Sequence, residues 1–544
     1  MLYSRAPIVQ VATRLSLLSV AIAPVAHAAN VPDDVTLAAQ QQLVRGNYDE
    51  PPSVDPAYSS TGSSSSVVQD MFEGLVTQDA QGNPIPALAT SWDVNQDGTR
   101  YVFHLRKDIH WSNGQPIVAS DFVYAYQRLV APKTAAPYAW YYAAAHVKNA
   151  QAIIDGKKPA AQLGVKALDD KTLAITLDQP LPYFISMLVH ESFFPVPKAV
   201  VKQYGDKWTT PKHIVTSSAF TLTQHIVNER IVVKRNPYYW NNKKTVLNRV
   251  TYLALSDTNA EYNRFKTGEI SITGHVPTES IDKIRKNAPK TLIISPKIAE
   301  YYYSFNTTKA PFNDAKVRKA FSYAINRQVI AQGILHLDYI PAYSFVPPAT
   351  AGYRLPTLEW SQLTQAERIK KAQAWLKEAG YDKQHPLTVT FDYPTDNKVR
   401  KIAIAVASML QKNLGVKVNL RNQDIKTFLQ KVHQHDLSMA SFQWGGDYNE
   451  ASTFLDLFST QGYNPGQWSN AKYDAFMEQA KHSLNAKTRL SLYHQAEQIL
   501  AKEMPVMPIY FETKAVLKQT NVGGYTTENP SHIRYSRDMY ITKP

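Results

Sequence analysis

The second half of the chain alternates between two hydrophobic patterns. Apolar residues recur at helical spacing in long segments, and short apolar runs of strand length stand between them. Helices are predicted over 317–334, 366–379, 399–413, 426–432, 471–483 and 487–502, and strands over 387–391, 416–420, 437–442 and 506–511. Strands that alternate with helices of a dozen residues are typical of an α/β layered domain.

The first half is richer in strand patterns and shows no internal repeat. Residues 36–45 alternate in the manner of a strand, and residues 48–56 have the composition of a loop. The Ser/Gly-rich stretch 59–66 leads into an amphipathic pattern at 67–72. Its serines suit a capped helix start, and a flexible linker or a ligand-facing loop is equally compatible with the pattern. We therefore expect two unlike halves.

The stretch 441–450 combines a strand end with chemistry suited to a ligand. Trp444 offers an aromatic platform, Gly445 and Gly446 leave backbone exposed, and Asp447 places a carboxylate where the strand ends. A ligand whose backbone lies against the chain and whose cationic end meets Asp447 fits this pattern. The residues are equally compatible with a structural role, in which Asp447 or Ser452 caps the following helix and Trp444 is buried.

Composition indicates a large globular protein without a nucleic-acid-binding tail. The 544 residues are 44% hydrophobic, which is enough for two or more cores. The formal net charge of +14 is spread along the chain without a run of five or six like charges, so we interpret it as solvated surface. The 32 tyrosines favour amphipathic contacts in a polar cleft.

The N-terminus has the pattern of a secretory signal. Arg5 and Arg14 precede or flank the apolar run 15–25, and Ala26-His27-Ala28 forms a cleavage site, which predicts a signal peptide over residues 1–28. The apolar run is too short to span a membrane. The chain has no cysteine, which excludes disulfides, a lipid-modified cysteine and thiolate metal sites. We expect a soluble, monomeric protein of the periplasm.

Motifs that suggest an enzyme fail on order or spacing. Lys266-Thr267-Gly268 precedes Ser469-Asn470-Ala471-Lys472, which is the reverse of their order in penicillin-recognising enzymes. His190-Glu191 lacks the second histidine of a zinc-protease motif. No nucleophile elbow, P-loop or dinucleotide fingerprint occurs. We expect neither catalysis nor a cofactor.

One run of residues resembles a known family. Leu105-Arg106-Lys107-Asp108 is followed by Trp111-Ser112-Asn113-Gly114 and then by Asp121-Phe122. This run resembles the family 5 solute-binding proteins of peptide, dipeptide and nickel ABC transporters, and the resemblance continues in register over almost the whole mature chain. Within the family it is strongest to the members that bind oligopeptides or murein tripeptide.

The resemblance implies an α/β, two-lobed periplasmic binding protein of type II, the Venus-flytrap architecture, with an extra subdomain in the first lobe. It implies the following division: signal peptide 1–28, lobe I in three parts (29–72, 198–298 and 515–544), extra subdomain 73–197, and ligand-closing lobe II 299–514.

The resemblance also implies a site for the amino terminus of a peptide. Asp447 matches the carboxylate that binds the α-ammonium group, and backbone groups of the preceding segment pair with the peptide as an added strand. The backbone partners are Gln443, Trp444, Gly445 and Gly446, with Ser60, Thr61 and Gly62 on the opposite wall. The other implied contacts are Tyr138, His190, Tyr302, Asn464 and Glu512. Packing remains an alternative role for Tyr138 and His190.

The departures concern the far end of the ligand. The family's cationic groups for the peptide C-terminus match Leu335, Val399, Val432 and Ser441, which are all uncharged. We therefore expect a ligand with a free ammonium and a longer, modified or solvent-reaching far end, with Glu512 favouring a cationic group there.

The function that the resemblance implies is capture of peptides for an inner-membrane ABC permease. Murein peptide, a nickel chelate and a chaperone or signalling role in the same cleft remain alternatives.

Overall fold

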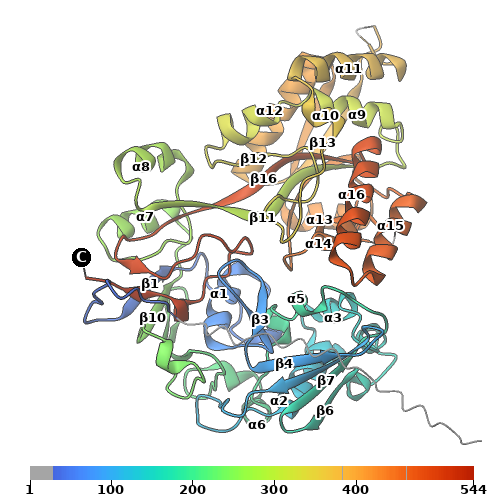
Figure 1. Cartoon of the computed structure of the whole chain (residues 1–544). Helices are drawn as coiled ribbons and strands as arrows, with labels where there is room; N and C mark the ends of the chain where they lie inside the picture. Colours follow the sequence, from blue (N-terminus) through green and yellow to red (C-terminus); the bar gives the residue numbers. More distant parts are fainter. Residues whose placement is uncertain (1–28, 383, 461, 544) are drawn as a thin grey trace, which may run out of the picture.

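The computed structural model describes residues 29–382, 384–460 and 462–543. The predicted signal peptide lies outside these residues. Figure 1 shows an upper lobe built around a large sheet and a lower body in two parts. We call the upper part lobe II, and the lower parts lobe I (beside β1 and α7) and the subdomain (beside β4 and α2).

The sheet of lobe II has six strands in the order β12-β16-β11-β15-β13-β14. The pairs of β13 with β14 and of β13 with β15 are parallel, and the others are antiparallel. Parallel pairing requires crossovers, which α12 and α13 provide. The strands are β11 (Leu292–Phe305), β12 (Ile340–Pro341), β13 (Thr388–Pro394), β14 (Lys417–Gln423), β15 (Met439–Gly445) and β16 (Val506–Leu517).

The helices of lobe II begin and end at residues that satisfy their free backbone groups. The N–H of Glu367 donates to Thr364 Oγ1 at the start of α11, and α12 ends at Gly415 in the left-handed conformation. The helices are α9 (Ala315–Ala324), α10 (Glu359–Gln362), α11 (Gln365–Glu378), α12 (Asn397–Leu414), α13 (Ile425–His433), α14 (Ser452–Leu455), α15 (Ala471–His482) and α16 (Ala486–Glu503).

The prediction of one helix over 317–334 was wrong. Helix α9 ends at Ala324, Ile325 is extended, and a separate π-helical segment covers Val329–Ile334. The buried guanidinium of Arg327 donates to the carbonyl oxygens of Ser322 and Ile325. These bonds satisfy acceptors at the end of the helix, and so an arginine that suits a helix by pattern ends it here.

Lobe I has a four-stranded sheet in the order β1-β10-β9-β8, with two small ladders, β2 with β3 and β17 with β18. Helix α1 has Thr61 as its N-cap, so it begins earlier than the predicted pattern at 67–72, and Ser63 to Ser66 lie within the helix instead of capping it. The strands are β1 (Gln42–Gly46), β2 (Val76–Gln78), β3 (Pro84–Pro86), β8 (Phe220–Ile226), β9 (Arg230–Arg235), β10 (Arg249–Leu253), β17 (Val522–Gly523) and β18 (Tyr540–Ile541). The helices are α1 (Gly62–Met71), α6 (Lys198–Tyr204), α7 (Thr258–Lys266) and α8 (Ile281–Asn287).

The subdomain has an antiparallel sheet in the order β4-β5-β7-β6. The predicted helix after the Asn113-Gly114 turn is α2, and Asp121 in its first turn accepts from Val118 N and Trp111 Nε1. The strands are β4 (Ala89–Val94), β5 (Arg100–Leu105), β6 (Val165–Asp169) and β7 (Thr172–Thr176). The helices are α2 (Ala119–Val130), α3 (Ala139–Ala144), α4 (Ala150–Ile154) and α5 (Phe184–Met187).

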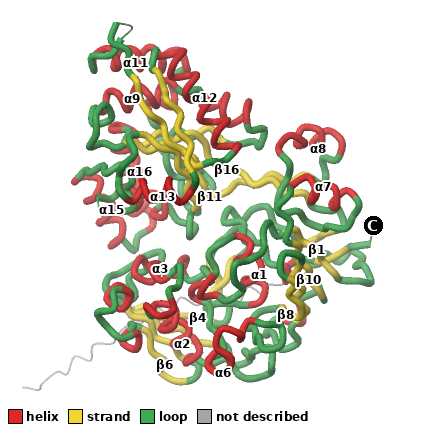
Figure 2. Tube along the Cα trace, turned by 180° about the vertical axis from the view of Figure 1, so that it is seen from behind, coloured by secondary structure: helices red, strands yellow, loops and turns green. Residues whose placement is uncertain are grey.

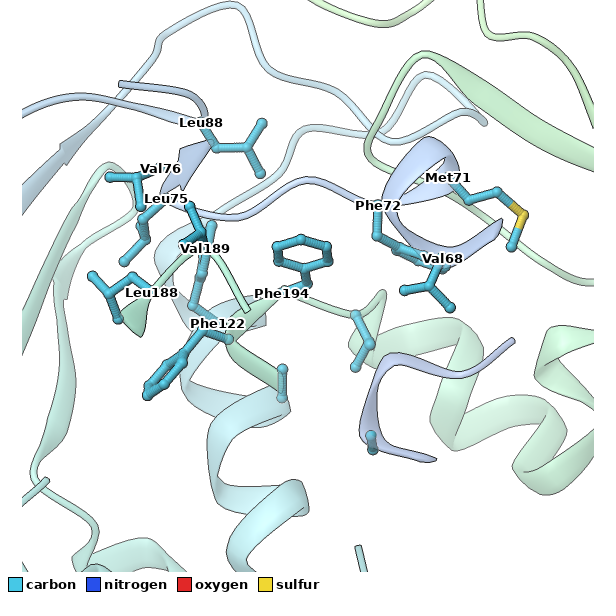
Figure 3. Packing of buried hydrophobic residues seen from close by; sticks show 14 of the residues in the cluster. Val68, Met71, Phe72, Leu75, Val76, Leu88, Phe122, Leu188, Val189 and Phe194 are labelled. Atoms are coloured by element: carbon cyan, nitrogen blue, oxygen red, sulfur yellow. The ribbon is translucent and has the colours of Figure 1, made fainter. Parts of the chain in front are cut away.

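Lobe I and the subdomain share one hydrophobic core. Figure 3 shows Phe194 between Phe72, at the end of α1, and Phe122 of α2, with side chains from both parts directed toward them. A Cβ on Gly74 would lie 2.9 Å from the Phe194 ring, so this close packing requires glycine. The common core fixes the start of α1 relative to the subdomain.

Two long strands connect the lobes. β11 and β16 run side by side from lobe II into lobe I, and the view from behind shows β11 extending toward α7 (Figures 1 and 2). Their pairing is interrupted between Pro296 and Glu300. The interruption spans the predicted boundary between residues 298 and 299, and the full set of domain boundaries remains a prediction.

Candidate ligand-binding cleft

Strand β15 has a backbone edge without a strand partner. One side of β15 pairs with β11 along its whole length, from Met439 to Gly445. The other side pairs with β13 only at Met439 and Ala440. Among the described strands, nothing pairs with residues 441–445 on that side, which we call the β15 edge. Unpaired N–H and C=O groups of this kind are a template for an added strand.

The two glycines after Trp444 have different surroundings. A Cβ on Gly445 would meet nothing within 4 Å, whereas one on Gly446 would lie 3.0 Å from Ile298 and Thr453 side-chain atoms. Trp444 is partly buried and donates through Nε1 to the carbonyl oxygen of Thr453 at 2.9 Å. The Trp444 ring therefore stabilises the turn that follows β15, and the absence of a side chain at Gly445 leaves the backbone there accessible to a ligand.

Asp447 does not cap the helix that follows it. The N-cap of α14 is Ala451, which provides no side-chain cap, and Oε2 of Glu450 accepts from Ser452 N at 2.7 Å. The backbone N–H of Asp447 donates to Thr453 Oγ1. Within the described residues the Asp447 carboxylate forms no ion pair, although it is only partly exposed. The helix-capping role is not observed for Asp447, whereas Trp444 does have the structural role that the sequence offered as an alternative, and binding by Asp447 remains a prediction.

The electrostatics around Asp447 describe an acid that lacks a counter-ion. Burial raises the pKa of Asp447 to about 6, with His190 opposing the shift and Glu191 adding to it. Burial, and next the charges of Asp447 and Glu191, raise the pKa of Tyr138 to about 12. A cation placed beside Asp447 would favour its ionised form.

The wall from the subdomain carries Tyr138 and His190 in direct contact. Their rings are tilted by 31° with centroids 4.3 Å apart. His190 Nδ1 accepts from Ser192 N, and Nε2 lies 4.0 Å from Glu191 Oε2. His190 is therefore held in place by its neighbours and also faces the cleft, so the structural and binding roles are compatible.

Glu191 was missed by the sequence analysis, which considered it only within a zinc motif. It is buried and accepts hydrogen bonds from Ser59 and Ser65. Burial alone would raise the pKa of Glu191, but His190 and the two serines lower it. Two serines that the sequence suggested as caps thus hold an ionised carboxylate instead.

The opposite wall is the start of α1. Ser60, Thr61 and Gly62 are all exposed, and Thr61 Oγ1 accepts from Ser64 N at 3.2 Å. A capped helix start is present, with Thr61 and not a serine as the cap, and the added Cβ of a side chain at Gly62 would meet nothing within 4 Å. The expected backbone contacts of these three residues with a ligand remain a prediction.

A cavity of about 370 Å³ lies where lobe I, lobe II and the subdomain meet. Of the predicted residues it brings together Gly62, His190, Gly446 and Asp447. Its basic side chains are distant from one another in the chain and belong to no motif, so no sequence pattern indicated them: Arg45, Lys297, Lys514, His532 and Arg534. A second cavity, of about 420 Å³, lies within lobe I between residues 78–85 and 524–539 and contains none of the predicted residues.

Two predicted contacts belong to the core of lobe II instead. Tyr302 is 1% exposed and packs against Phe345, Phe442 and Phe458, because alternate side chains of β11 face the helices. Asn464 is buried and its side chain bonds both backbone groups of Trp468, which closes a turn. Both expectations are corrected: these residues support the site from behind.

The expectation that Glu512 favours a cationic ligand group is also corrected. Lys297 Nζ lies 3.1 Å from Oε2 of Glu512, and Lys398 Nζ lies 3.3 Å from Oε1. Gln443 Nε2 donates to the same carboxylate at 3.0 Å. Burial alone would raise the pKa of Glu512, but the two lysines lower it, so the carboxylate is ionised and already neutralised.

The described residues lack the features of two other kinds of site or segment. No group of three or more His, Cys, Asp or Glu side chains is arranged to hold a metal ion there. No helix in the described part of the chain has the length and apolar composition needed to cross a membrane.

Two α/β lobes joined by paired strands, with a cavity at their junction, define a two-lobed binding protein. The model of the bacterial extracellular solute-binding proteins, family 5, matches residues 83–466, and the chain belongs to this family. Proteins of this family are binding components of transporters.

Three known proteins illustrate the similarity. The chain is 43% identical over 521 residues to the periplasmic oligopeptide-binding protein of Escherichia coli K12, covering 95% of this chain and 96% of the relative. It is 42% identical over 528 residues to a probable deoxycholate-binding periplasmic protein of the same organism, covering 97% and 98%. A structure of the periplasmic murein tripeptide-binding protein MppA, in its unliganded open form, matches with a TM-score of 0.85 and 41% identity, covering 94% of this chain and 99% of that one.

Proposed function

We propose that this protein captures peptides in the cleft between its lobes and delivers them to an inner-membrane ABC permease. One observation carries the proposal: the unpaired carboxylate of Asp447 stands at the end of the β15 edge. A free strand edge followed by an acid matches a peptide main chain that begins with an ammonium group.

The energetics of this arrangement favour affinity without side-chain specificity. At about 4 Å and an effective dielectric constant near 20, one charge pair is worth roughly 4 kcal/mol before desolvation. Main-chain hydrogen bonds along residues 441–445 add to it and are indifferent to the peptide's sequence. Relatives named for oligopeptides and for murein tripeptide support this class of ligand.

Delivery follows from closure of the two lobes. Similarity to an unliganded open form supports an open conformation for the structure described here. A ligand that contacts both the β15 edge and the start of α1 stabilises the closed state, because only that state provides both sets of contacts. No catalytic step and no cofactor are part of the proposal.

The proposed location is the periplasm, where the relatives' names place them, with residues 1–28 removed as a signal peptide. The protein acts there as a soluble monomer, and the permease binds the form in which the two lobes are closed.

Calorimetry on protein that has been unfolded and refolded to remove bound ligand tests the proposal. Trialanine is expected to bind, and N-acetyl-trialanine to bind at least about a hundredfold more weakly, since acetylation removes the charge that pairs with Asp447. Deoxycholate, which the name of one relative suggests, is expected to bind more weakly than trialanine. Tighter binding of deoxycholate, or of an unfolded protein, would refute peptide capture.

A further inference from the structure

The lining of the cavity beside Asp447 also contains basic side chains. Its lining contains Arg45 from β1, Lys297 from β11, Lys514 from β16 and Arg534 from the C-terminal segment. The acidic groups in the same lining, Asp447 and Glu191, lie at the start of the ligand strand proposed above. The cavity therefore combines acidic and basic groups in one lining.

Half of the basic charge is neutralised within the protein. Arg45 Nη1 lies 3.9 Å from Asp70 Oδ2, and Lys297 pairs with Glu512. His532 adds no charge near neutral pH, because burial, and next the nearby Arg534, lower its pKa to about 3. The net excess of positive charge rests on the two remaining side chains, Lys514 and Arg534.

Lys514 forms no ion pair within the described residues. Its Nζ donates to the carbonyl oxygen of Gly274 at 2.8 Å and stands 4.6 Å from the centre of the Tyr48 ring. These neighbours are neutral, and so is His275 beneath them, whose pKa is lowered to about 4 by burial and by Lys514. The ammonium group has donors left for a further acceptor.

Burial of Arg534 costs more free energy than burial of Lys514, because Arg534 is more completely buried. It is 7% exposed, and only its Nη1 finds an acceptor, the carbonyl oxygen of Ile533 at 3.0 Å. Its Nε and Nη2 have no hydrogen-bond partner and no accessible surface, its Cζ lies 5.6 Å from the centre of the Tyr525 ring, and within the described residues no carboxylate pairs with it. Because its unpaired donors are not accessible, Arg534 contributes to the cavity through its buried positive charge, and an anion bound nearby would offset the cost of burying that charge.

We propose that Lys514, assisted by the buried positive charge of Arg534, binds a carboxylate of the ligand, carried by an acidic side chain close to its amino terminus. This proposal rests on the proposed function, since the ammonium group at Asp447 places the start of the peptide in the same cavity. Opposite charges in one lining orient the ligand, and the basic groups add a side-chain preference to otherwise sequence-tolerant binding.

The test uses C-terminally amidated tetra-alanine in which one of the first three residues is Glu or Gln. At one of these positions the Glu peptide is expected to bind about tenfold more tightly than its Gln counterpart, as a charge-assisted pair provides. The preference should shrink as the salt concentration rises. If no position discriminates by more than twofold, the proposal is wrong.

Substitutions in the protein then test whether the preference for the Glu peptide depends on Lys514. Lys514→Met, which keeps the apolar stem, is expected to reduce the preference to about twofold or less. Lys290→Met, an exposed lysine outside the cavity, is the matched control and should leave the preference unchanged. A preference that persists in Lys514→Met would overturn the assignment. Should that variant not fold, the comparison of Glu and Gln peptides on the unmodified protein decides alone.

Two further binding measurements distinguish failure of this carboxylate proposal from failure of the proposed peptide capture. Tetra-alanine amide is expected to bind, and complete absence of binding would contradict peptide capture itself. If the free terminal carboxylate, and not an acidic side chain, gives the tenfold gain, the basic groups bind the C-terminus and the side-chain assignment fails.

Discussion

The ring of Tyr183 in the subdomain stacks on the ring of Tyr448 in lobe II, with centroids 5.2 Å apart and planes 9° apart. Tyr183 also donates through its hydroxyl group to Asp456 Oδ2 at 3.4 Å. Both rings are buried, and Tyr448 directly follows Asp447 in the chain. The anchor for the proposed ammonium group is therefore attached to a contact between the subdomain and lobe II.

Tyr183→Ala is expected to lower the free energy of unfolding by about 3 kcal/mol, because it removes a buried aromatic side chain. Tyr183→Phe, which keeps the ring, is the control and should cost about 1 kcal/mol or less. In a double-mutant cycle with Tyr448→Ala, denaturant unfolding should give a coupling of about 0.5–1.5 kcal/mol. Strict additivity would show that the stacked rings do not join the two parts.

Asp447 is expected to destabilise the empty protein. Its pKa is about 6 when folded against 3.8 when unfolded, so the unfolded chain loses this proton first as the pH rises. The penalty is absent below pH 4 and complete above pH 6. Asp447→Asn should raise the free energy of unfolding by about 1–2 kcal/mol at pH 7 and leave it unchanged at pH 3.5.

Thermal unfolding at the two pH values measures this difference. Asp34→Asn, a substitution of an exposed aspartate, is the matched control and should have no effect at either pH. A variant at Asp447 that is less stable at pH 7 would show that the carboxylate has an unrecognised partner in the empty protein.

Peptide affinity is expected to fall as the pH falls through 6. An ammonium group beside Asp447 lowers the pKa of the carboxyl in the complex, so binding below pH 6 must release a proton. Affinity for trialanine should be constant above about pH 7 and decrease by up to tenfold per pH unit below 6. Calorimetry in buffers of different ionisation enthalpy measures the released proton.

Asp447→Asn provides the control for that pH dependence. Its affinity should be lower by about a hundredfold at pH 7 and should vary little between pH 5 and 7. A variant that retains the full pH dependence would assign it to other groups that face Asp447, of which His190 and Glu191 are the nearest titratable ones.

Methylation of ligand backbone nitrogens is expected to weaken binding. The β15 edge offers main-chain partners at residues 441–445, and an N-methyl group removes a donor and obstructs the approach of the strands. A tetrapeptide methylated at the nitrogen that faces this edge should bind at least about tenfold more weakly, as measured by competition with trialanine. Scanning the methyl group along the peptide should show an alternating effect, because only every second residue faces the edge. A uniform effect would argue against an added strand.

Amidation of the ligand's C-terminus is expected to change affinity by less than about threefold. Leu335, Val399, Val432 and Ser441 are buried and uncharged. The two lysines near Gln443 are held by Glu512. Calorimetry with trialanine and its amide checks this, and a tenfold loss would contradict it. Glu512→Gln releases both lysines, so in that variant the free carboxylate should bind more tightly than the amide.

Local patterns in the sequence determined the elements and part of the site. The strand that leads into Asp447, the capped start of α1 at Thr61, and the Trp111-to-Asp121 motif are set by contacts within a few residues. For the same reason the family resemblance could place Asp447 at the end of a strand. Neighbours in sequence suffice wherever the physical cause is a cap, a turn or a periodic apolar face.

Only the tertiary structure decided which side chains face the cleft and which charges are already paired. Tyr302 and Asn464 matched the family pattern but lie in the core, since the face of a strand that is buried depends on the packed helices. Glu512 looked like a free acid until β11 and α12 brought Lys297 and Lys398 to it. Lys514 and Arg534 meet in one cavity only after folding, because no spacing along the chain encodes a contact between β16 and the C-terminal segment.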